Sequence, residues 1–327
     1  MRAVTIDRSG PPDVLALRDV AAPAVGSQQV LVDVAFCGCN WADTQVRAGI
    51  YAHPVTYPMI LGFEISGVVS AVGDEVATVA VGDRVSAIVG RGGGYAEQVA
   101  VDAKDIIALP AKVPLDVAAA FPIQALTAYH MLHTIYRVQT GDAVFCHAIG
   151  GGVGLYVTQL ARRAGARVIG TVGTPGKERL ALDYGAERVV NHREEDFVAA
   201  ALAFTAGKGL DLAIDSLGAS MLDRTYDAMR NLGHIINIGE AEGHPFPNTR
   251  ERILPRSLTF TRFHLQHVDP RSAGWKRGYE TVLAAIVDGS LQVPIVERFP
   301  LSEAAAMHRC LERRGVAGKL LLATGLN

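Results

Sequence analysis

The sequence predicts an α/β protein of two domains, one built on a doubly wound parallel sheet and the other a β-rich barrel. Three observations predict this fold. The chain has 327 residues, which exceeds a comfortable single core. Closely spaced short strands fill its first third, and strand-like and helix-like segments alternate after Pro122. A cluster of glycines at residues 150–154 separates two of the later strands.

Composition describes a globular protein and argues against several kinds of partner. Hydrophobic residues make up 49% of the chain and charged residues 20%, which is typical of a large apolar core. The 31 Lys and Arg residues are balanced by 33 Asp and Glu, so no basic surface for nucleic acid is indicated. No apolar stretch approaches the ~20 residues of a membrane helix. Residues 1–6 resemble a strand rather than a signal peptide, so we expect a cytoplasmic protein with no membrane partner.

The four cysteines indicate neither a disulfide framework nor a metal site. Cys37 and Cys39 form a C-x-C pair, but no second pair lies at ligand spacing. Cys146 and Cys310 are isolated in the sequence. We therefore predict that no metal is bound.

The first 122 residues are rich in short strands. Strands are expected within residues 1–6, 30–35, 65–73 and 79–87. Glycines lie inside the third of these segments, and turn residues separate all of them. Internal glycines and closely spaced turns are typical of a small, bent barrel.

Beyond Pro122, strands and helices alternate, which predicts a parallel sheet with helices on both faces. The expected strands cover residues 143–148, 168–172, 189–190, 212–215 and 235–239. The expected helices cover residues 125–135, 153–164, 177–184, 197–204 and 222–229. After residue 262 we expect helices at 275–288 and 303–313, and strands at 295–296 and 319–323. The last strand is suited to pairing with the first domain.

The glycine cluster follows one strand and begins a helix, which is how a dinucleotide pyrophosphate is held at a helix N-terminus. Gly151 would let the backbone approach the phosphates, and Gly154 would let the helix pack close to the strand. Gly152 and Val153 complete this part of the predicted cofactor site. Ile149 replaces the first glycine of the usual G-x-G-x-x-G, so an ordinary glycine-rich turn stays open as an alternative.

The end of the next strand indicates which dinucleotide is bound. NAD-binding proteins place an acidic residue there, ~20 residues beyond the glycines, to bind a ribose hydroxyl. Here Gly173 and Thr174 follow the strand, and Lys177 comes before any carboxylate. A 2′-phosphate would therefore be accepted rather than repelled, with His192 or Arg179 as further donors. The sequence predicts NADPH, although Lys177 as an ordinary solvated lysine stays open.

With its β-rich first part, the chain resembles the zinc-independent quinone oxidoreductases of the medium-chain dehydrogenase/reductase superfamily, nearly from end to end. Besides the glycine turn, the resemblance is carried by GCNWAD (38–43), RAGIY (47–51), LGFEISG (61–67), AVGDRV (80–85), IGTVGT (169–174) and NHREED (191–196). It implies a Rossmann NADPH-binding domain at residues 123–262 and a GroES-like catalytic domain formed by residues 1–122 and 263–327. It also implies a homodimer built through the nucleotide-binding sheet, with residues 235–238 and 258–261 as candidate edge strands.

The resemblance also bears on zinc. Zinc-using members of the superfamily place a cysteine where this chain has Asn40 and a histidine where it has Phe63. Phenylalanine cannot bind a cation, and asparagine is a poor zinc ligand. The four-cysteine lobe of those enzymes has no counterpart after residues 91–95. Both zinc sites are therefore expected to be missing.

Without a Lewis acid, hydrogen-bond donors must polarise the substrate oxygen. The resemblance implies Asn40, Tyr51 and Asp43 on the barrel side of an active cleft between the domains. Asn40 would donate its amide, and Tyr51 its phenol, to a quinone or ketone oxygen. Plainer alternatives stay open: Asn40 as a helix cap, Tyr51 as a loop residue and Asp43 as a structural residue that positions a neighbour. Gln45 stands where relatives often carry a second tyrosine, which weakens any tyrosine-pair mechanism.

The resemblance assigns further cofactor contacts. Thr127 and Tyr129 match the stretch that lies along the nicotinamide and ribose, and Ile238 joins them from a later strand. Arg262 would bind either the 2′-phosphate side or the nicotinamide end. Tyr129 as a core aromatic and Arg262 as an exposed charge are the alternatives. Lys319, in the closing strand, is expected to be mainly structural.

The expected function is transfer of reducing equivalents from NADPH to a quinone. An α,β-unsaturated carbonyl or an enoyl thioester is the alternative acceptor, because the same donors serve any conjugated carbonyl. A thioester would need basic residues for its phosphates, and Arg262 and His264 form no obvious cluster. A third hypothesis is an NADPH-binding protein with vestigial activity that binds nucleic acid or serves a structural role. The near-neutral charge argues against nucleic acid.

Overall fold

The computed structural model describes residues 1–51, 55–241 and 248–325. The chain forms two compact units. The first unit consists of Met1–Ile123 and Asp269–Asn327, and the second of Gln124–Val268. The described residues form two sheets in the first unit and one in the second, and each unit has its own apolar core.

Six parallel strands form the sheet of the second unit, in the order β11-β10-β9-β12-β13-β14. They are β9 (Ala143–Cys146), β10 (Arg167–Val172), β11 (Arg188–Asn191), β12 (Leu210–Asp215), β13 (Met229–Asn237) and β14 (Thr259–Arg262). All of β9 and the last five residues of β10 are buried, as expected for strands covered on both faces. The strand order reverses between β9 and β12, which is where doubly wound sheets bind ligands, beyond the carboxyl ends of the strands.

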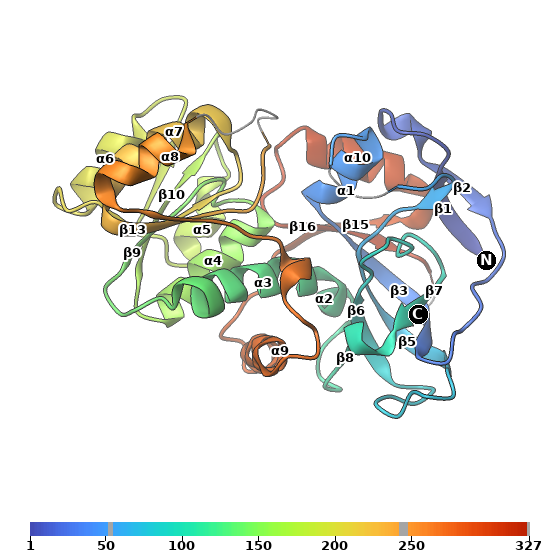
Figure 1. Ribbon diagram of the computed structural model, residues 1–327. Coiled ribbons are helices and arrows are strands. Elements are labelled where there is room, and N and C mark those ends of the chain that lie inside the picture. The colour runs from blue at the N-terminus through green and yellow to red at the C-terminus, as the bar shows by residue number, and fades with distance from the viewer. Residues whose placement is uncertain (52–54, 242–247, 326–327) are drawn as a thin grey trace. The chain divides into compact units, whose positions relative to one another are not determined.

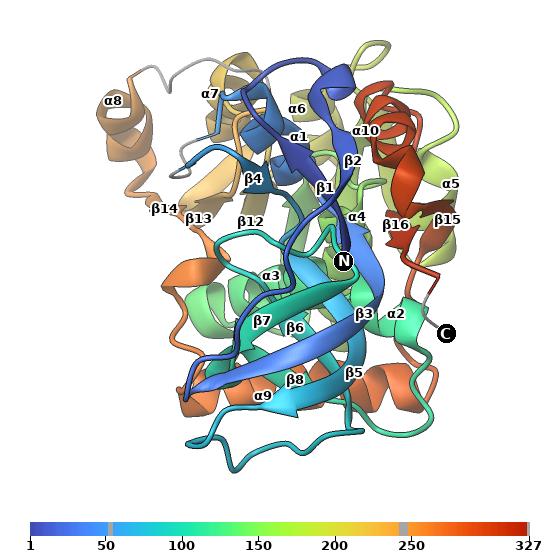
Figure 2. The ribbon, with the colours of Figure 1, turned by 90° about the vertical axis from the view of Figure 1, so that its right-hand side faces the viewer.

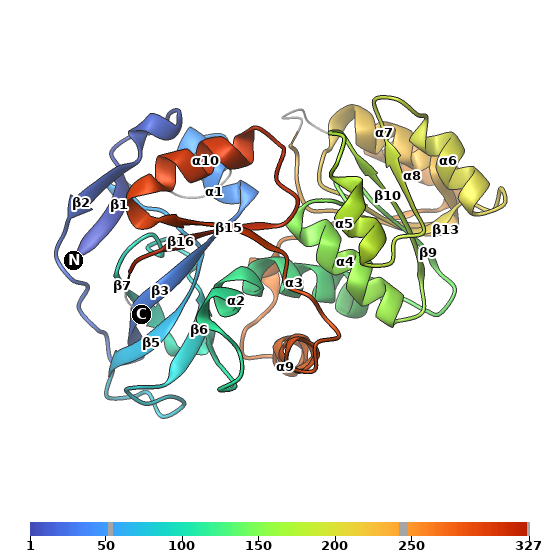
Figure 3. The ribbon, with the colours of Figure 1, turned by 180° about the vertical axis from the view of Figure 1, so that it is seen from behind.

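Helices cover both faces of this sheet, with α4 and α5 on one face and α6, α7 and α8 on the other (Figures 1 and 3). The helices are α3 (Pro122–Tyr129), α4 (Gly152–Arg163), α5 (Glu178–Asp183), α6 (Phe197–Phe204), α7 (Ala219–Ala228) and α8 (Thr249–Ile253). Phe145 and Ile169 of the sheet pack with Phe197 of α6 and Leu222 of α7 in the core. The predicted doubly wound Rossmann fold is therefore confirmed.

Two segments of the second unit differ from the sequence prediction. The helix expected at residues 125–135 is α3 followed by a π-helix, His130–Tyr136, which ends where Arg137 turns left-handed at φ 65°. β13 pairs with β12 on one side and β14 on the other, so residues 235–238 lie inside the sheet and are not an edge. Among the strands that the structure describes, β14 is the edge beside β13.

The first unit is built around β3 (Gln29–Cys39), its longest strand, which bends across the sheet (Figure 2). β5 pairs along one side of β3, while β7 and β16 share the other side, β7 at the start of β3 and β16 at its end. Two register shifts within β3 are bulges that bend the strand. Because β16 pairs with β3, the predicted return of the last strand to the first part of the chain is confirmed.

The remaining elements of the first unit complete this seven-stranded sheet, form a second sheet of three strands, and cover them. The other strands are β1 (Arg2–Ile6), β2 (Ala16–Asp19), β4 (Met59–Ile60), β5 (Glu64–Val72), β6 (Arg84–Ile88), β7 (Gln98–Asp102), β8 (Ile106–Ala108), β15 (Ile295–Pro300) and β16 (Lys319–Ala323). The helices are α1 (Trp41–Ala48), α2 (Leu115–Ala120), α9 (Ala273–Val287) and α10 (Ala304–Glu312). Val32, Ile65, Val85 and Leu322 are fully or almost fully buried in its core. No helix within the described ranges is long and apolar enough to cross a membrane.

Candidate functional site

In the first unit, the candidate catalytic residues gather where β3 ends and α1 begins. Asn40 is the N-cap of α1, with extended backbone, and its carbonyl oxygen accepts the N–H of Asp43 at 3.0 Å. The carboxylate of Asp43 in turn accepts the N–H of Asn40 at 2.8 Å. An asparagine followed three residues later by an acidic residue favours such a helix start, because both side chains can bind backbone N–H groups left free there. Asn40 thus caps the helix and remains a candidate donor.

The side chain of Asn40 belongs to a buried polar cluster with Glu64 and Lys319, which we call the Asn40 cluster. The amide nitrogen of Asn40 donates to Glu64 Oε1 at 2.7 Å. The ammonium of Lys319 donates to Asn40 Oδ1 at 2.8 Å and forms an ion pair with Glu64 Oε1. Asn40 is 6% exposed, and the other two side chains are fully buried. Glu64 also accepts the N–H of Ile123 at 2.9 Å, so its carboxylate is bound through both oxygens.

Asp43 is fully buried beside this cluster. Burial raises its pKa to about 7, although the N–H of Asn40 and the charge of Lys319 favour the ionised form. Its second oxygen, Oδ1, has no hydrogen-bond partner among the described residues. The placement fits a residue that positions Asn40 through its backbone. Direct contact of Asp43 with substrate has no support in this geometry.

A chain of buried polar groups runs from α10 to Tyr95 beneath the same helix. Arg47 donates to Glu312 at 2.6 Å and to His308 Nδ1 at 3.3 Å, and His308 Nε2 lies 3.2 Å from the hydroxyl of Tyr95. Because arginine only donates, Nδ1 must accept, and the proton of the neutral imidazole is on Nε2. Burial, and then the charge of Arg47, lower the pKa of His308 to about 3. Burial and nearby Asp43 raise the pKa of Tyr95 well above its usual value.

The other predicted residues of the first unit are part of its apolar packing. Tyr51 is half-buried and packs against the core, and Phe63 is buried within it. Cys37 and Cys39 are buried there as well, and burial raises the pKa of both thiols far above the usual value, which makes them inert. Within the described residues, no three His, Cys, Asp or Glu side chains are grouped so that they could hold a metal ion.

In the second unit, the glycine turn has the close approaches that its composition predicts. α4 begins at Gly152 with Gly151 as its N-cap. A Cβ on Gly154 would lie 2.6 Å from the backbone of Ile149, so the glycine lets the helix approach the chain leaving β9. Ala148 adopts a left-handed conformation at φ 50°, which glycine normally occupies. The irregular residue of this turn is therefore Ala148, two positions before the first of the three consecutive glycines.

Gly152 has a neighbour of its own. A Cβ there would lie 2.0 Å from the side chain of Gln124, which α3 presents to the turn. α3 also carries Thr127, which is nearly buried at 8% exposure, and Tyr129, which is half-buried. The ring of Tyr129 lies 4.8 Å from that of His133 on the π-helix. The predicted residues of α3 and of the glycine turn thus belong to one neighbourhood of the second unit.

The residues predicted for the 2′-phosphate gather at the carboxyl end of β10. A Cβ on Gly150 would meet the carbonyl oxygen of Lys177 at 2.3 Å, so the lysine segment packs directly on the glycine turn. A Cβ on Gly173 would lie 2.7 Å from His192 Nε2. Thr174, Lys177 and His192 are each partly exposed. The end of β10 thus presents a basic residue and an imidazole beside the helix N-terminus.

A second polar chain lies at the carboxyl ends of β12, β13 and β14. Asn237 donates to the buried carboxylate of Asp215 at 2.6 Å, and Arg262 donates to Asn237 Oδ1 at 2.6 Å. Ile238 follows Asn237 and donates its N–H to the carbonyl of Asp215 at 2.8 Å. The order of strands puts Arg262 four strands from β10, roughly 19 Å at ~4.8 Å per strand. The strand order thus separates Arg262 from the residues predicted for the 2′-phosphate.

Comparison with known proteins agrees with this geometry. A zinc-binding dehydrogenase model matches residues 152–285, and an alcohol dehydrogenase GroES-like domain model matches residues 26–111. A probable quinone oxidoreductase of Schizosaccharomyces pombe is 36% identical over 320 residues, 98% of this chain and 96% of that protein. The chain belongs to the zinc-independent quinone oxidoreductases of the medium-chain dehydrogenase/reductase superfamily. It is therefore an oxidoreductase of the medium-chain type.

Other members of the family extend the comparison. A 2-haloacrylate reductase of Burkholderia is 32% identical, with 98% of each chain covered. The crystal structure of Escherichia coli quinone oxidoreductase complexed with NADPH superposes with a TM-score of 0.94 at 30% identity. That comparison covers 99% of this chain and 100% of the other. Both units of this oxidoreductase therefore have counterparts in the solved structure.

Sequence reasoning named Lys319 only as a structural residue and overlooked Glu64, Asp215 and Asn237. Glu64 begins a buried strand, and Lys319 begins another, so each was an ionisable residue within an apolar run. That pattern is a signal, because such residues are almost never fully buried unless they are paired. Asp215 carries the same signal at the end of β12, and Asn237, a buried polar residue, ends β13. The sequence could not show which residues pair with one another, because strand pairing brings the partners together.

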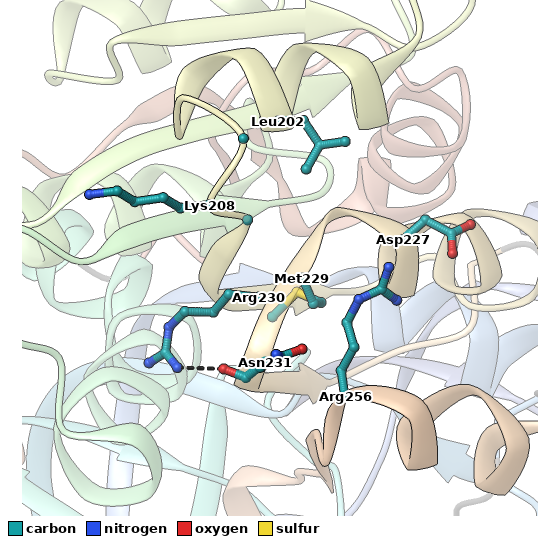
Figure 4. A pocket seen from close by; sticks show the side chains of 9 residues that line it. Leu202, Lys208, Asp227, Met229, Arg230, Asn231 and Arg256 are labelled. Carbon is teal, nitrogen blue, oxygen red and sulfur yellow. Dashed lines mark hydrogen bonds between the residues drawn. The ribbon is translucent and has the colours of Figure 1, made fainter.

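A pocket of about 280 Å³ lies at the opposite, amino-terminal edge of the parallel sheet, away from the switch point (Figure 4). Lys208, Arg230 and Arg256 are among its lining residues, and their side chains point in different directions. Arg230 is paired with Asp211 at 2.5 Å, and Arg256 donates to the carbonyl of Tyr226 at 3.2 Å. The pocket therefore presents no converging set of charges.

Proposed function

We propose that this oxidoreductase transfers a hydride from NADPH to a quinone, with Asn40 as the principal donor to the quinone oxygen. The observation that carries the proposal is the fixed, nearly buried amide of Asn40 at the start of α1. Relatives named as quinone oxidoreductases support the acceptor. An NADPH complex of one such relative supports the cofactor.

The second unit offers groups that suit both the pyrophosphate and the 2′-phosphate of NADPH. The N-terminus of α4 offers backbone N–H groups and a helix dipole to the phosphates, and Gly151 leaves room for them. Lys177 and His192 would meet the 2′-phosphate beyond β10, and no carboxylate lies between the end of that strand and Glu178. Thr127, Tyr129 and Ile238 would contact the ribose and nicotinamide. The polar chain of Asp215, Asn237 and Arg262 would lie at the same end of the cofactor.

The bound cofactor supplies the hydride, and the protein stabilises the charge that follows it onto the acceptor. Asn40 donates to the oxygen that becomes negative, an interaction worth ~3 kcal/mol when the donor is held in advance. Tyr51 is the second candidate donor, and Asp43 holds Asn40 through its backbone N–H. The hydroquinone product takes its proton from solvent, because its anion is stable enough to need no dedicated acid.

A conjugated carbonyl is the second candidate acceptor, and one specific observation favours it. The Burkholderia relative is a 2-haloacrylate reductase, whose name denotes an unsaturated carboxylate as substrate. The same amide donor would serve its carbonyl oxygen.

We also infer that two copies of this chain associate through β14. In the described part of the second unit, β14 pairs with β13 alone, so its outer edge is open to another strand. Unpaired strand edges favour pairing with a second chain. Sedimentation equilibrium at micromolar concentration should report a dimer, and a monomer at all concentrations would contradict this.

The test of function is NADPH oxidation followed with 1,4-benzoquinone, an enone, 2-chloroacrylate and crotonyl-CoA as acceptors. We expect turnover with the quinone, undiminished by a chelator, and a roughly 100-fold loss of kcat in Asn40→Ala. Turnover on 2-chloroacrylate or the thioester alone would overturn the quinone assignment. Loss of activity with chelator would contradict the absence of metal, and an Asn40→Ala enzyme with full kcat would remove Asn40 from the chemistry.

A further inference from the structure

The Asn40 cluster contains an ion pair that stability alone does not explain. Glu64 and Lys319 are both fully buried, and taking two charges out of water costs about as much as their attraction returns. A pair of apolar side chains of similar volume is often as stable, or more so. Gly38 leaves space for the pair, because a Cβ there would lie 2.6 Å from Glu64 Oε1. The fold thus accommodates a costly pair at one particular place.

That place is set by the strands. Glu64 begins β5 and Lys319 begins β16, and both strands pair with β3, which ends directly before Asn40. Three side chains from distant parts of the sequence therefore meet at one end of the sheet. Within the described residues, the hydrogen bonds of the Lys319 ammonium go to Asn40 and Glu64.

The chemistry of the two charged groups determines which way the amide of Asn40 faces. An ammonium only donates hydrogen bonds, and an ionised carboxylate only accepts them. The oxygen of the amide must therefore face Lys319 and its nitrogen must face Glu64. Turning the amide by 180° would set oxygen against the carboxylate and N–H against the ammonium, so both contacts would become repulsive.

We propose that Glu64 and Lys319 are positioning residues for the reduction, which hold the amide of Asn40 in the orientation it needs as a donor. This inference rests on the proposed role of Asn40. The cation on the amide oxygen also polarises the group, which strengthens its N–H as a donor in a buried site.

The test removes both charges at once and follows the steps of catalysis separately. The double variant Glu64→Leu/Lys319→Met keeps an apolar volume and leaves no unpaired buried charge. We expect it to fold and to bind NADPH with unchanged affinity, while kcat with quinone falls roughly 10- to 100-fold. Arg298→Leu is the matched control, because it removes an ion pair with Asp116 elsewhere in the same unit and should leave kcat unchanged.

A purely structural role is separated by repeating the double change in an Asn40→Ala background. If the pair acts through Asn40, the double change there costs little further kcat, since the group it orients is already gone. An equal loss in both backgrounds, or a double variant with full kcat, would overturn the inference and leave the role of Asn40 intact. An Asn40→Ala enzyme with full kcat would instead overturn the proposed function. Should the double variant not fold, Glu64→Gln/Lys319→Gln allows the same comparison, because side-chain amides both donate and accept and so no longer enforce one orientation.

Discussion

At the scale of single residues, the two units use the same device. In each, an asparagine amide lies between a donor-only cation and an acceptor-only carboxylate: Asn40 with Lys319 and Glu64, and Asn237 with Arg262 and Asp215. Such an arrangement leaves the amide one orientation. In both, the amide is held from one end by a cation and from the other by a carboxylate.

Lys177 should discriminate between the two nicotinamide cofactors. Lys177→Ala removes the cation placed beside the end of β10, and we expect KM for NADPH to rise roughly tenfold or more while KM for NADH hardly changes. Steady-state kinetics with both cofactors checks this. Lys208→Ala, an exposed lysine of the same unit, is the control. Equal effects of Lys177→Ala on NADPH and NADH would remove the residue from the 2′-phosphate site.

His308 should make the first unit less stable in acid. Its pKa is about 3 in the folded protein, against ~6.5 when unfolded, so between pH 4 and 6 the unfolded chain binds one more proton. Stability then rises with pH, by about 1.4 kcal/mol per pH unit from this residue. Asp43, whose folded pKa is raised to about 7, contributes the opposite sign over this range, so only a difference between variants isolates His308.

The variant His308→Gln should therefore show a pH dependence of the unfolding free energy that is shallower by about 1.4 kcal/mol per pH unit between pH 4 and 6. Urea denaturation at several pH values measures it. Nitrogen NMR of the wild-type ring at pH 7 should show the proton on Nε2. A parallel pH profile for variant and wild type would contradict the buried neutral imidazole.

At the scale of elements, the glycine turn combines one strained residue with one indispensable glycine. Ala148 holds a left-handed conformation that costs an ordinary residue roughly 1 kcal/mol, whereas Gly154 permits contact with the backbone of Ile149. We therefore expect exchange between alanine and glycine to change the free energy of unfolding in different ways at the two positions.

Ala148→Gly should leave the unfolding free energy unchanged or raise it by up to about 1 kcal/mol, because relief of strain competes with a more flexible unfolded chain. Gly154→Ala should lower it by several times that amount and weaken NADPH binding, since the added methyl would stand 2.6 Å from backbone atoms. Thermal and urea unfolding, with NADPH titration, compare the pair. A neutral Gly154→Ala would show that α4 shifts without cost.

At the scale of the whole molecule, the order of strands separates Lys177, predicted to bind the 2′-phosphate, from Arg262, for which the sequence leaves two positions open. Lys177 lies beyond β10 and Arg262 ends β14, on opposite sides of the switch point between β9 and β12. Arg262→Ala should therefore change KM for NADPH and NADH by the same factor. A selective effect on NADPH would place Arg262 at the 2′-phosphate after all.

The sequence by itself determined much of the local structure of this oxidoreductase. The helix Phe197–Phe204 and the strand Lys319–Ala323 begin and end where their composition predicts, and the strand Arg167–Val172 begins one residue before its predicted start. Their apolar and β-branched or helix-forming residues agree with the packing around them. The glycines, the acid-free end of β10 and the cap at Asn40 are likewise local patterns, and local patterns can be read along a chain.

Only the tertiary structure decided what surrounds those residues. Asn40 and Lys319 are separated by 279 positions and meet because β16 pairs with the end of β3. A contact of that kind depends on strand register, and a slip of one residue would turn each side chain to the other face. The sequence therefore indicated which groups are candidates for the chemistry, and the pairing of strands decided which way the amide of Asn40 faces.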